Sequence, residues 1–207
     1  MFRYILISFT LFSGYFGFGQ GIDSYSLELK EKGNTRLIRI QSGDILLRKG
    51  KGWLSHLMSQ QLNERYPFSH VGIFYKVNDE KAWVVHSISN DYCSGICTVP
   101  VENFVGEAVA GSFAVIRPKK DWINIALLQS KISAHLTQEP IDFDFYFDET
   151  DATKMFCSEF VWFLLQGVGL QKKDWNFCQI QNKKVRGFSN FLDQNFFEFV
   201  YFPLSGF

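Results

Sequence analysis

Two short runs rich in β-branched and aromatic residues lie close together in the chain and constrain its fold more than any other feature. Residues 70–75 read HVGIFY and residues 82–88 read AWVVHSI, with Asn78 and Asp79 between them. Such runs favour strands, and Asn and Asp are common in the turn that joins two antiparallel strands. The pattern therefore predicts an antiparallel β-hairpin and a sheet built around it.

The remaining segments predict the strands and helices of one α+β domain. No repeat, low-complexity tract or Pro/Gly/Ser-rich linker divides the chain, and its length suits a single core. Apolar side chains almost all round the last of the expected helices indicate that it is buried. A lead-in that is polar or forms a short helix is expected at residues 24–32, and the aromatic-rich residues 188–207 are left unassigned. Strands are expected at residues 37–40, 44–48 and 112–117, and helices at 53–65, 122–136 and 157–165.

Residues 1–19 have the pattern of a secretory signal peptide. A short cationic start is followed by an apolar run at residues 4–12, and residues 17–19 have the small-x-small form that a signal peptidase reads. Cleavage before Gln20 leaves a single mature domain of residues 20–207. Because no Cys stands at the cleavage site, a lipid anchor is not supported. An uncleaved membrane anchor is the alternative, although the run is short and interrupted by glycine. We expect an exported protein, periplasmic or secreted, with no membrane span after cleavage.

The composition excludes two classes of protein. The chain has 21 Lys and Arg against 21 Asp and Glu, and 46% of its 207 residues are hydrophobic. This apolar content can bury a core, which excludes a disordered chain. A neutral chain also lacks the overall excess of cations that neutralises nucleic-acid phosphates. We therefore expect no nucleic-acid partner, and the oligomeric state stays open.

Export to an oxidising compartment changes how the four cysteines are interpreted, because disulfides persist there. Cys93 and Cys97 can close a small loop if the backbone turns at Gly95, so a disulfide and two free thiols are both open. A zinc site at this pair would need two more ligands, and no second closely spaced Cys or His pair is present. Cys178 lacks any helix-start signal, whereas Cys157 begins the apolar helix.

Three polar residues stand inside otherwise apolar segments. His70 opens the first run of the hairpin, His86 lies in the second, and Cys157 begins the buried helix. Burying such groups costs free energy unless they are paired. A turn near residue 78 pairs His70 with about residue 86, which brings the two imidazoles within reach. A register shifted by one residue could still change the face on which each lies.

A cysteine at a helix N-terminus is suited to nucleophilic catalysis. The positive end of the helix dipole lowers the thiol pKa, and the amides of the first turn can stabilise an oxyanion. A histidine within reach would take the thiol proton and return it to the leaving group, while a second polar side chain orients the ring. Cys157, His70 and His86 could fill these roles. The alternative is a packed helix and two structural histidines.

The other polar candidates are interpreted as structural. Asp44 is expected to make turn or strand-end hydrogen bonds, and Glu159 to be an ion or hydrogen-bond partner that points away from Cys157. An acidic cluster lacks the glycine and ligand order of a calcium loop, so we expect a solvated surface there. This cluster comprises Asp142, Asp144, Asp148, Glu149 and Asp151, and the residues expected to be non-catalytic are His56, His135 and Cys178.

Three motifs follow one another along the chain, reading GDIL at residues 43–46, SHVGI at 69–73 and FCSEFV at 156–161. In this order they make residues 40–170 resemble the YiiX/YebB-like family of permuted papain-fold proteins. That family is a branch of the NlpC-type cysteine peptidase and amidase superfamily, which includes lecithin retinol acyltransferase-like proteins. Residues 141–147 look like the family's extended aspartate-bearing segment. The resemblance implies an α+β, circularly permuted papain-like domain with an antiparallel sheet packed against the nucleophile helix.

The resemblance also implies roles for the three polar residues. Cys157 corresponds to the nucleophile and His70 to the general base and acid. YiiX-like members typically carry Glu at the third position, whereas this chain has His86, more like the second histidine of the acyltransferase-type relatives. A neutral histidine can orient another imidazole, but it supplies no fixed negative charge to stabilise an imidazolium.

These observations together lead to an expected function. We expect an exported cysteine hydrolase that cleaves an amide bond without a metal or organic cofactor. The resemblance favours peptides of the cell wall as substrates, with peptidoglycan as the partner, and lipid or acyl amides second. The alternatives are an acyl-amide hydrolase or acyltransferase of the same fold, an inactive module that binds a peptide, glycan or lipid, and a zinc site made by His70, His86 and Cys157.

Overall fold

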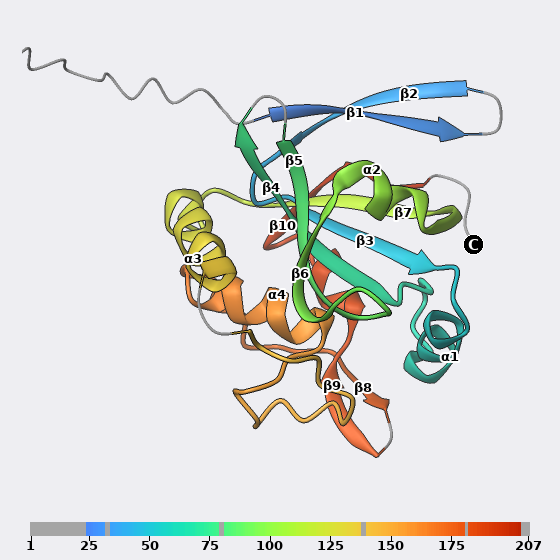
Figure 1. Cartoon of the computed structure of the whole chain (residues 1–207), viewed down its shortest axis with the longest axis vertical. Coiled ribbons are helices and arrows are strands. Elements are labelled where there is room, and N and C mark those ends of the chain that lie inside the picture. The colour runs from blue at the N-terminus through green and yellow to red at the C-terminus, as the bar shows by residue number, and fades with distance from the viewer. Residues whose placement is uncertain (1–23, 32–33, 79–80, 138–139, 181, 204–207) are drawn as a thin grey trace, which may run out of the picture.

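The computed structural model describes residues 24–31, 34–78, 81–137, 140–180 and 182–203 of the chain (Figure 1). The expected signal peptide, residues 1–19, lies outside the described residues. Within the described ranges, no helix is both long and apolar enough to cross a membrane.

A six-stranded antiparallel sheet forms the centre of the molecule, in the order β10-β7-β3-β4-β5-β6. The expected hairpin is confirmed, because β4 and β5 pair with Ile73 opposite Val85. Strands β4 and β7 are rich in β-branched and aromatic residues, and β3 carries the buried run Ile45, Leu46 and Leu47, which suits their central place. The strands are β3 (Ile45–Gly50), β4 (His70–Asn78), β5 (Lys81–Ser89), β6 (Ser94–Pro100), β7 (Ala108–Pro118) and β10 (Phe197–Tyr201).

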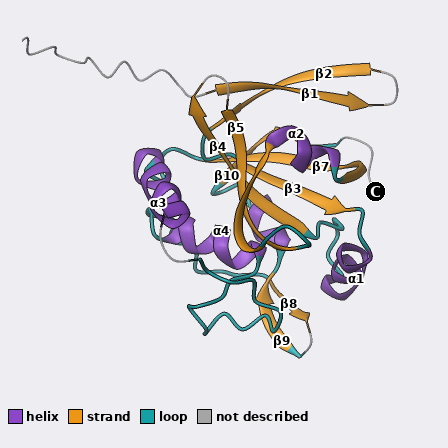
Figure 2. Cartoon of the chain, in the orientation of Figure 1, coloured by secondary structure: helices purple, strands orange, loops and turns teal. Residues whose placement is uncertain are grey.

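One face of the sheet is covered by the buried helix α4 (Cys157–Gln166), with α3 (Ile125–Thr137) beside it (Figure 2). Ile45, Leu47 and Val71 alternate along their strands toward this helix and are fully buried, as the two-residue period of a strand requires. The aromatic C-terminal segment that the sequence left unassigned closes this core. Its 3-10 helix η1 (Phe188–Leu192) places Phe191 against Trp162 of α4, with parallel rings 4.0 Å apart.

The opposite face is covered by the two-stranded sheet of β1 (Ser24–Glu31) and β2 (Asn34–Gln41), together with the short helix α2 (Val101–Gly106). The expectation of a polar lead-in or short helix at residues 24–32 is therefore wrong. Leu27 and Leu29 alternate with polar residues and are both buried. A strand places these two leucines on one face, against the core, and so buries apolar surface that a short helix would leave exposed.

The remaining elements differ from expectation mainly at their ends. Helix α1 (Trp53–Leu62) ends before residue 65 because Asn63 adopts a left-handed conformation, with φ of 48°. Helix α3 begins at Ile125, where the Asn124 side chain accepts the amide of Leu127 at 3.0 Å. Strands β8 (Phe177–Ile180) and β9 (Lys183–Arg186) form a small separate hairpin.

Two acidic residues lie in the interior rather than at the surface. Asp44, expected at a turn or strand end, accepts the Gln41 amide at 2.8 Å and forms an ion pair with Arg117 at 2.7 Å. Asp144, expected in a solvated cluster, is buried instead. Its carboxylate accepts the amides of Tyr146 and Asp148 and so closes the loop that leads to α4.

Candidate active site

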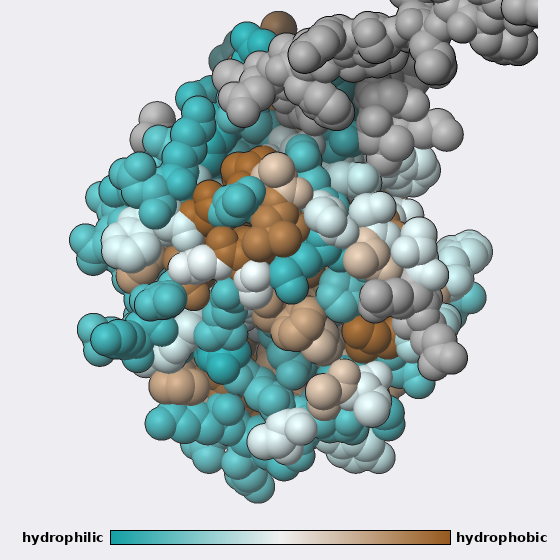
Figure 3. All heavy atoms as spheres, turned by 90° about the vertical axis from the view of Figure 1, so that its left-hand side faces the viewer, coloured by the Kyte–Doolittle hydropathy of each residue, from teal (hydrophilic) through white to brown (hydrophobic). Residues whose placement is uncertain are grey.

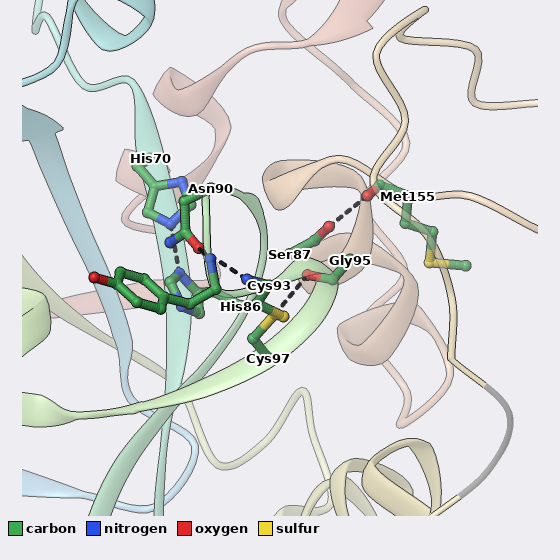
Figure 4. The surroundings of a disulfide bond; sticks show 9 residues. His70, His86, Ser87, Asn90, Cys93, Gly95, Cys97 and Met155 are labelled. Atoms are coloured by element: carbon green, nitrogen blue, oxygen red, sulfur yellow. Dashed lines mark hydrogen bonds between the residues drawn. A yellow bond between two sulfur atoms is a disulfide. The ribbon is translucent and has the colours of Figure 1, made fainter.

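The two histidines of the hairpin are in direct contact (Figure 4). Nε2 of His70 lies 2.6 Å from Nδ1 of His86, and the rings meet edge to face. The register differs from the expected one. Because Ile73 pairs with Val85, His86 lies across from Gly72 and reaches His70 diagonally. The imidazoles thus share a face of the sheet, a point that the sequence left open.

Gly72 leaves the space that this contact needs. A Cβ atom at position 72 would lie 2.4 Å from Cγ1 of Val84 and 3.1 Å from Cβ of His86. Both distances are shorter than ordinary van der Waals contact, so any side chain there would push against β5. The glycine lets the backbone of β4 approach the ring-bearing residue of the next strand.

Cys157 is the first residue of α4, and its sulfur faces three backbone amides. These are the amides of Val71, Ser158 and Cys157 itself. Val71 follows His70 in the chain, so the sulfur lies beside the backbone from which the His70 ring projects. Among the described residues, no hydrogen bond joins Cys157 to either imidazole.

Two hydrogen bonds hold the residues that precede Cys157. The Ser87 hydroxyl, on β5 next to His86, donates to the carbonyl of Met155 at 2.5 Å (Figure 4). The Glu159 carboxylate accepts the amide of Phe156 at 3.3 Å, which is the structural role expected for it. The nucleophile segment and the histidine strand are thereby tied to each other.

Burial decides the ionisation of the site. It raises the pKa of the Cys157 thiol to about 11, against the backbone amides and the Arg48 charge, which lower it. Burial also lowers the pKa of His86 to about 3 and that of His70 well below its usual range, and the Arg48 charge adds to both shifts. The expectation of a lowered thiol pKa is therefore wrong for this arrangement, because the cost of burying a thiolate outweighs the dipole and amide contributions. At neutral pH the site holds a thiol and two neutral imidazoles.

The contact between the imidazoles limits their tautomers. If Nε2–H of His70 donates to Nδ1 of His86, then Nδ1 of His70 carries no proton and can accept one from a thiol. The proton of His86 then sits on its Nε2, which is buried with no hydrogen-bond partner among the described residues. In the reverse arrangement Nδ1 of His70 carries the proton, so His70 is not a base. Only the first tautomer pair suits catalysis.

Arg48 is a member of this cluster that sequence reasoning missed. It stands opposite His70 in the pairing of β3 with β4, and its side chain is 4% exposed. Its guanidinium contacts Glu107 at 2.6 Å, donates to the Phe104 carbonyl at 3.0 Å and stacks over the Phe104 ring at 4.5 Å. An arginine at the end of an apolar strand is a polar residue in an apolar segment, the same signal that singled out the histidines.

Phe104 of α2 forms the apolar floor beneath these polar groups. Its ring centroid lies 5.6 Å from that of His70 and 5.6 Å from that of His86. The ring packs against both imidazoles, whose burial lowers their pKa values. Helix α2 is too short to show a helical period, so the sequence did not predict it.

A groove of about 630 Å³ runs along the edge strand β6 and ends at α2. Its walls include the disulfide between Cys93 and Cys97, Asn103 and Glu107. Cys97 pairs directly with His86. The turn expected at Gly95 lies instead at residues 90–93, and Gly95 pairs with Ile88 inside β6 with φ of 118°. The groove therefore borders the histidine pair through β6 and the arginine through Glu107.

The other candidates lie apart from this cluster. His135 packs against Phe160 and Phe163, and Cys178 lies in β8, where burial raises its pKa to about 11. His56 is in α1. The described part of the chain contains no group of three His, Cys, Asp or Glu placed to hold one metal ion, so the arrangement of His70, His86 and Cys157 gives no support to the zinc alternative.

The fold and the site together define a class. A cysteine at the start of a buried helix, facing a sheet whose histidines precede it in the chain, is the arrangement of a papain-like cysteine hydrolase with permuted order. Residues 39–186 match the family described as permuted papain-like amidase enzymes, YaeF/YiiX, C92 family. The chain belongs to this family, which confirms the resemblance and the fold class and supports a cysteine amidase. A comparison with curated proteins found no match.

Proposed function

We propose that this protein is an exported cysteine amidase that cleaves amide bonds in cell-wall peptides, with Cys157 as nucleophile, His70 as base and acid, and His86 as the residue that orients His70. One observation carries the assignment. The Cys157 sulfur faces three backbone amides, and one of them belongs to Val71, the residue that follows His70 of the hydrogen-bonded histidine pair.

The geometry supports a general-base mechanism rather than a preformed ion pair. The thiol attacks the substrate carbonyl while its proton passes to Nδ1 of His70, and first-turn amides of α4 stabilise the oxyanion. His70 then gives the proton to the departing amine, which leaves a thioester on Cys157. Water, deprotonated by His70, hydrolyses this thioester and releases the acid and the thiol. The His86 ring holds the Nε2–H of His70 throughout.

The groove along β6 supports a peptide as the substrate. β6 is the edge strand of the sheet, and an edge strand offers unpaired backbone groups to an extended chain. Thr98 and Asn103 add polar side chains to its lining, while Val99 and Leu136 add apolar ones. Export is supported by the signal-like residues 1–19 and by the Cys93–Cys97 disulfide, since disulfides persist in oxidising compartments.

The test is hydrolysis of defined amides by the mature protein, residues 20–207. We expect release of free amino groups from peptidoglycan stem peptides, abolished in Cys157→Ser and reduced by 10²-fold or more in His70→Ala. Cys178→Ser is the matched control and should keep full activity. Hydrolysis that survives Cys157→Ser would overturn the assignment.

Acyl amides are the second candidate substrates, and a specific surface favours them. Apolar side chains gather over α3 and α4 (Figure 3), where Leu127, Leu136 and Phe163 are each about two-fifths exposed. Leu136 also lines the groove. An N-acyl amide that is hydrolysed faster than every stem peptide would favour this second substrate class over the first.

A further inference from the structure

We propose that Arg48 is a positioning residue of the active site. Its fixed positive charge stabilises the negative charge that forms on Cys157, and Glu107 adjusts how strongly the Arg48 charge acts on the sulfur. This inference rests on the proposed function, because it concerns how the same nucleophile is activated. It answers a question that the site raises, since burial of the thiol opposes the negative charge that Cys157 must develop.

The placement of Arg48 carries the proposal. Its guanidinium is almost fully buried and held from several sides by Phe104 and Glu107, which fixes its position. It is also the charged side chain whose field reaches Cys157, His70 and His86 alike. A buried cation interacts strongly across a medium of low dielectric constant. Its charge favours negative charge on Cys157 and disfavours a standing imidazolium on either histidine before substrate is bound.

The other charged and titratable groups around α4 are placed differently. Glu159, on α4 itself, lies among Asp144, Glu149 and Arg186 on the loop and β9. From α3, Lys131 reaches Gly167 beyond the C-terminal end of α4, and His135 packs on Phe160 and Phe163. Arg48 of β3 is thus the charged side chain that acts on Cys157, while His70 of β4 and His86 of β5 contact each other and Phe104.

Glu107 can change how strongly the Arg48 charge acts on Cys157. Its side chain is 63% exposed, yet its carboxylate contacts Arg48 at 2.6 Å and partly offsets the guanidinium charge. Because Glu107 lines the groove, a bound substrate that draws this carboxylate away would leave more of the Arg48 charge for the reacting sulfur. Glu107 thereby connects groove occupancy to the nucleophile.

A purely structural role for Arg48 makes a different prediction. Arg48 ties β3 to α2, so removing either partner of the ion pair would loosen the same contact and disturb Cys157 in the same direction. The electrostatic role predicts opposite directions for Arg48 and Glu107, because their charges act on the sulfur with opposite signs. The two roles are therefore distinguishable.

The experiment is the pH dependence of iodoacetamide labelling of Cys157, measured by mass spectrometry in a Cys178→Ser background. We expect Arg48→Met to raise the apparent pKa of Cys157 by about one unit, which is tenfold in thiolate at a given pH, and Arg48→Lys to raise it less. Glu107→Gln should lower the apparent pKa. Lys51→Met is the matched control, since this exposed lysine also binds α2, at the Gly106 carbonyl, and should change nothing.

Shifts of the same sign in Arg48→Met and Glu107→Gln, or none in either, would overturn the proposal. If Arg48→Met does not fold, Arg48→Lys and the exposed Glu107→Gln still decide the sign. Labelling needs no substrate, so it separates this inference from the proposed function. Opposite shifts without any amide hydrolysis would keep the role of Arg48 and reject the amidase.

Discussion

At the scale of single residues, the candidate site was predictable wherever a polar group interrupts an apolar run. His70, His86 and Cys157 were singled out in this way, and the structure brings the two imidazoles into contact and places the Cys157 sulfur at the amide of Val71, next to His70 in the chain. Arg48 satisfies the same criterion, but its partners lie on α2, far along the chain. A sequence shows which groups need partners, whereas only the fold shows which partners they find. The prediction of a lowered thiol pKa was wrong for the same reason, because the burial of Cys157 depends on residues distant in the chain that no local motif identifies.

Gly72 provides a prediction at this scale. Gly72→Ala places a methyl group against Val84 and His86, so we expect a loss of about 1–3 kcal/mol in the free energy of unfolding and a larger proportional loss of activity. Denaturant unfolding and amide hydrolysis measure the two effects. Gly52→Ala is the matched control, because a Cβ there meets nothing within 4 Å. Equal stability in the two variants would contradict the packing argument.

At the scale of elements, the sequence pattern predicted the central strands β3, β4, β5 and β7 but not the outer strands β1 and β10. The pairing of β4 with β5 follows from local sequence and a short turn. β10 pairs with β7 from the far end of the chain, and in β1 only Leu27 and Leu29 alternate with polar residues, which is too short a pattern to predict a strand. Such elements form because a surface of the sheet is available to them, a tertiary effect that local propensity does not contain.

The hairpin of β5 and β6 provides the prediction at this scale. The disulfide closes a loop of five residues, for which loop-closure entropy gives about 2 kcal/mol of stabilisation. Replacing both Cys93 and Cys97 by Ser should therefore lower Tm by about 4–8 °C. Because Cys97 pairs with His86, we also expect activity to fall several-fold.

Differential scanning calorimetry with and without reductant checks this prediction. Reductant should lower the Tm of the wild-type protein to that of the double variant and leave the variant itself unchanged. The same Tm for all four samples would show that the disulfide contributes nothing to the stability of the hairpin.

At the scale of the whole molecule, the site lies where the two cores of the sheet meet. Cys157 belongs to the core under α4, whereas Phe104 belongs to the core under α2 and the β1–β2 hairpin. His70 begins β4, so its backbone lies at the end of the sheet, where the α4 side and the α2 side are both within reach. Three motifs, each short, were enough to predict this architecture, because their order along the chain fixes the permuted topology.

Burying two neutral histidines in one molecule makes its stability depend on pH. In the folded state His86 has a pKa of about 3, below its unfolded value of about 6.5. Between these values the unfolded chain binds the proton and the folded chain does not, so stability is full above pH 6.5 and falls as the pH is lowered. For His86 alone the loss between pH 7 and pH 5 is about 2 kcal/mol. The pKa of His70 is lowered in the same direction, so it adds to the loss.

Glu159 acts in the opposite sense, since its pKa is raised to about 8 and its contribution is lost as the pH rises. Comparison with His86→Gln removes this background, because the glutamine can still hydrogen-bond to His70 without titrating. We expect the wild-type protein to lose about 2 kcal/mol more than His86→Gln between pH 7 and pH 5, measured by urea unfolding at both pH values. Parallel losses in the two proteins would mean that His86 is protonated in the folded state, and His86 could then no longer act as the neutral partner on which the base tautomer of His70 depends.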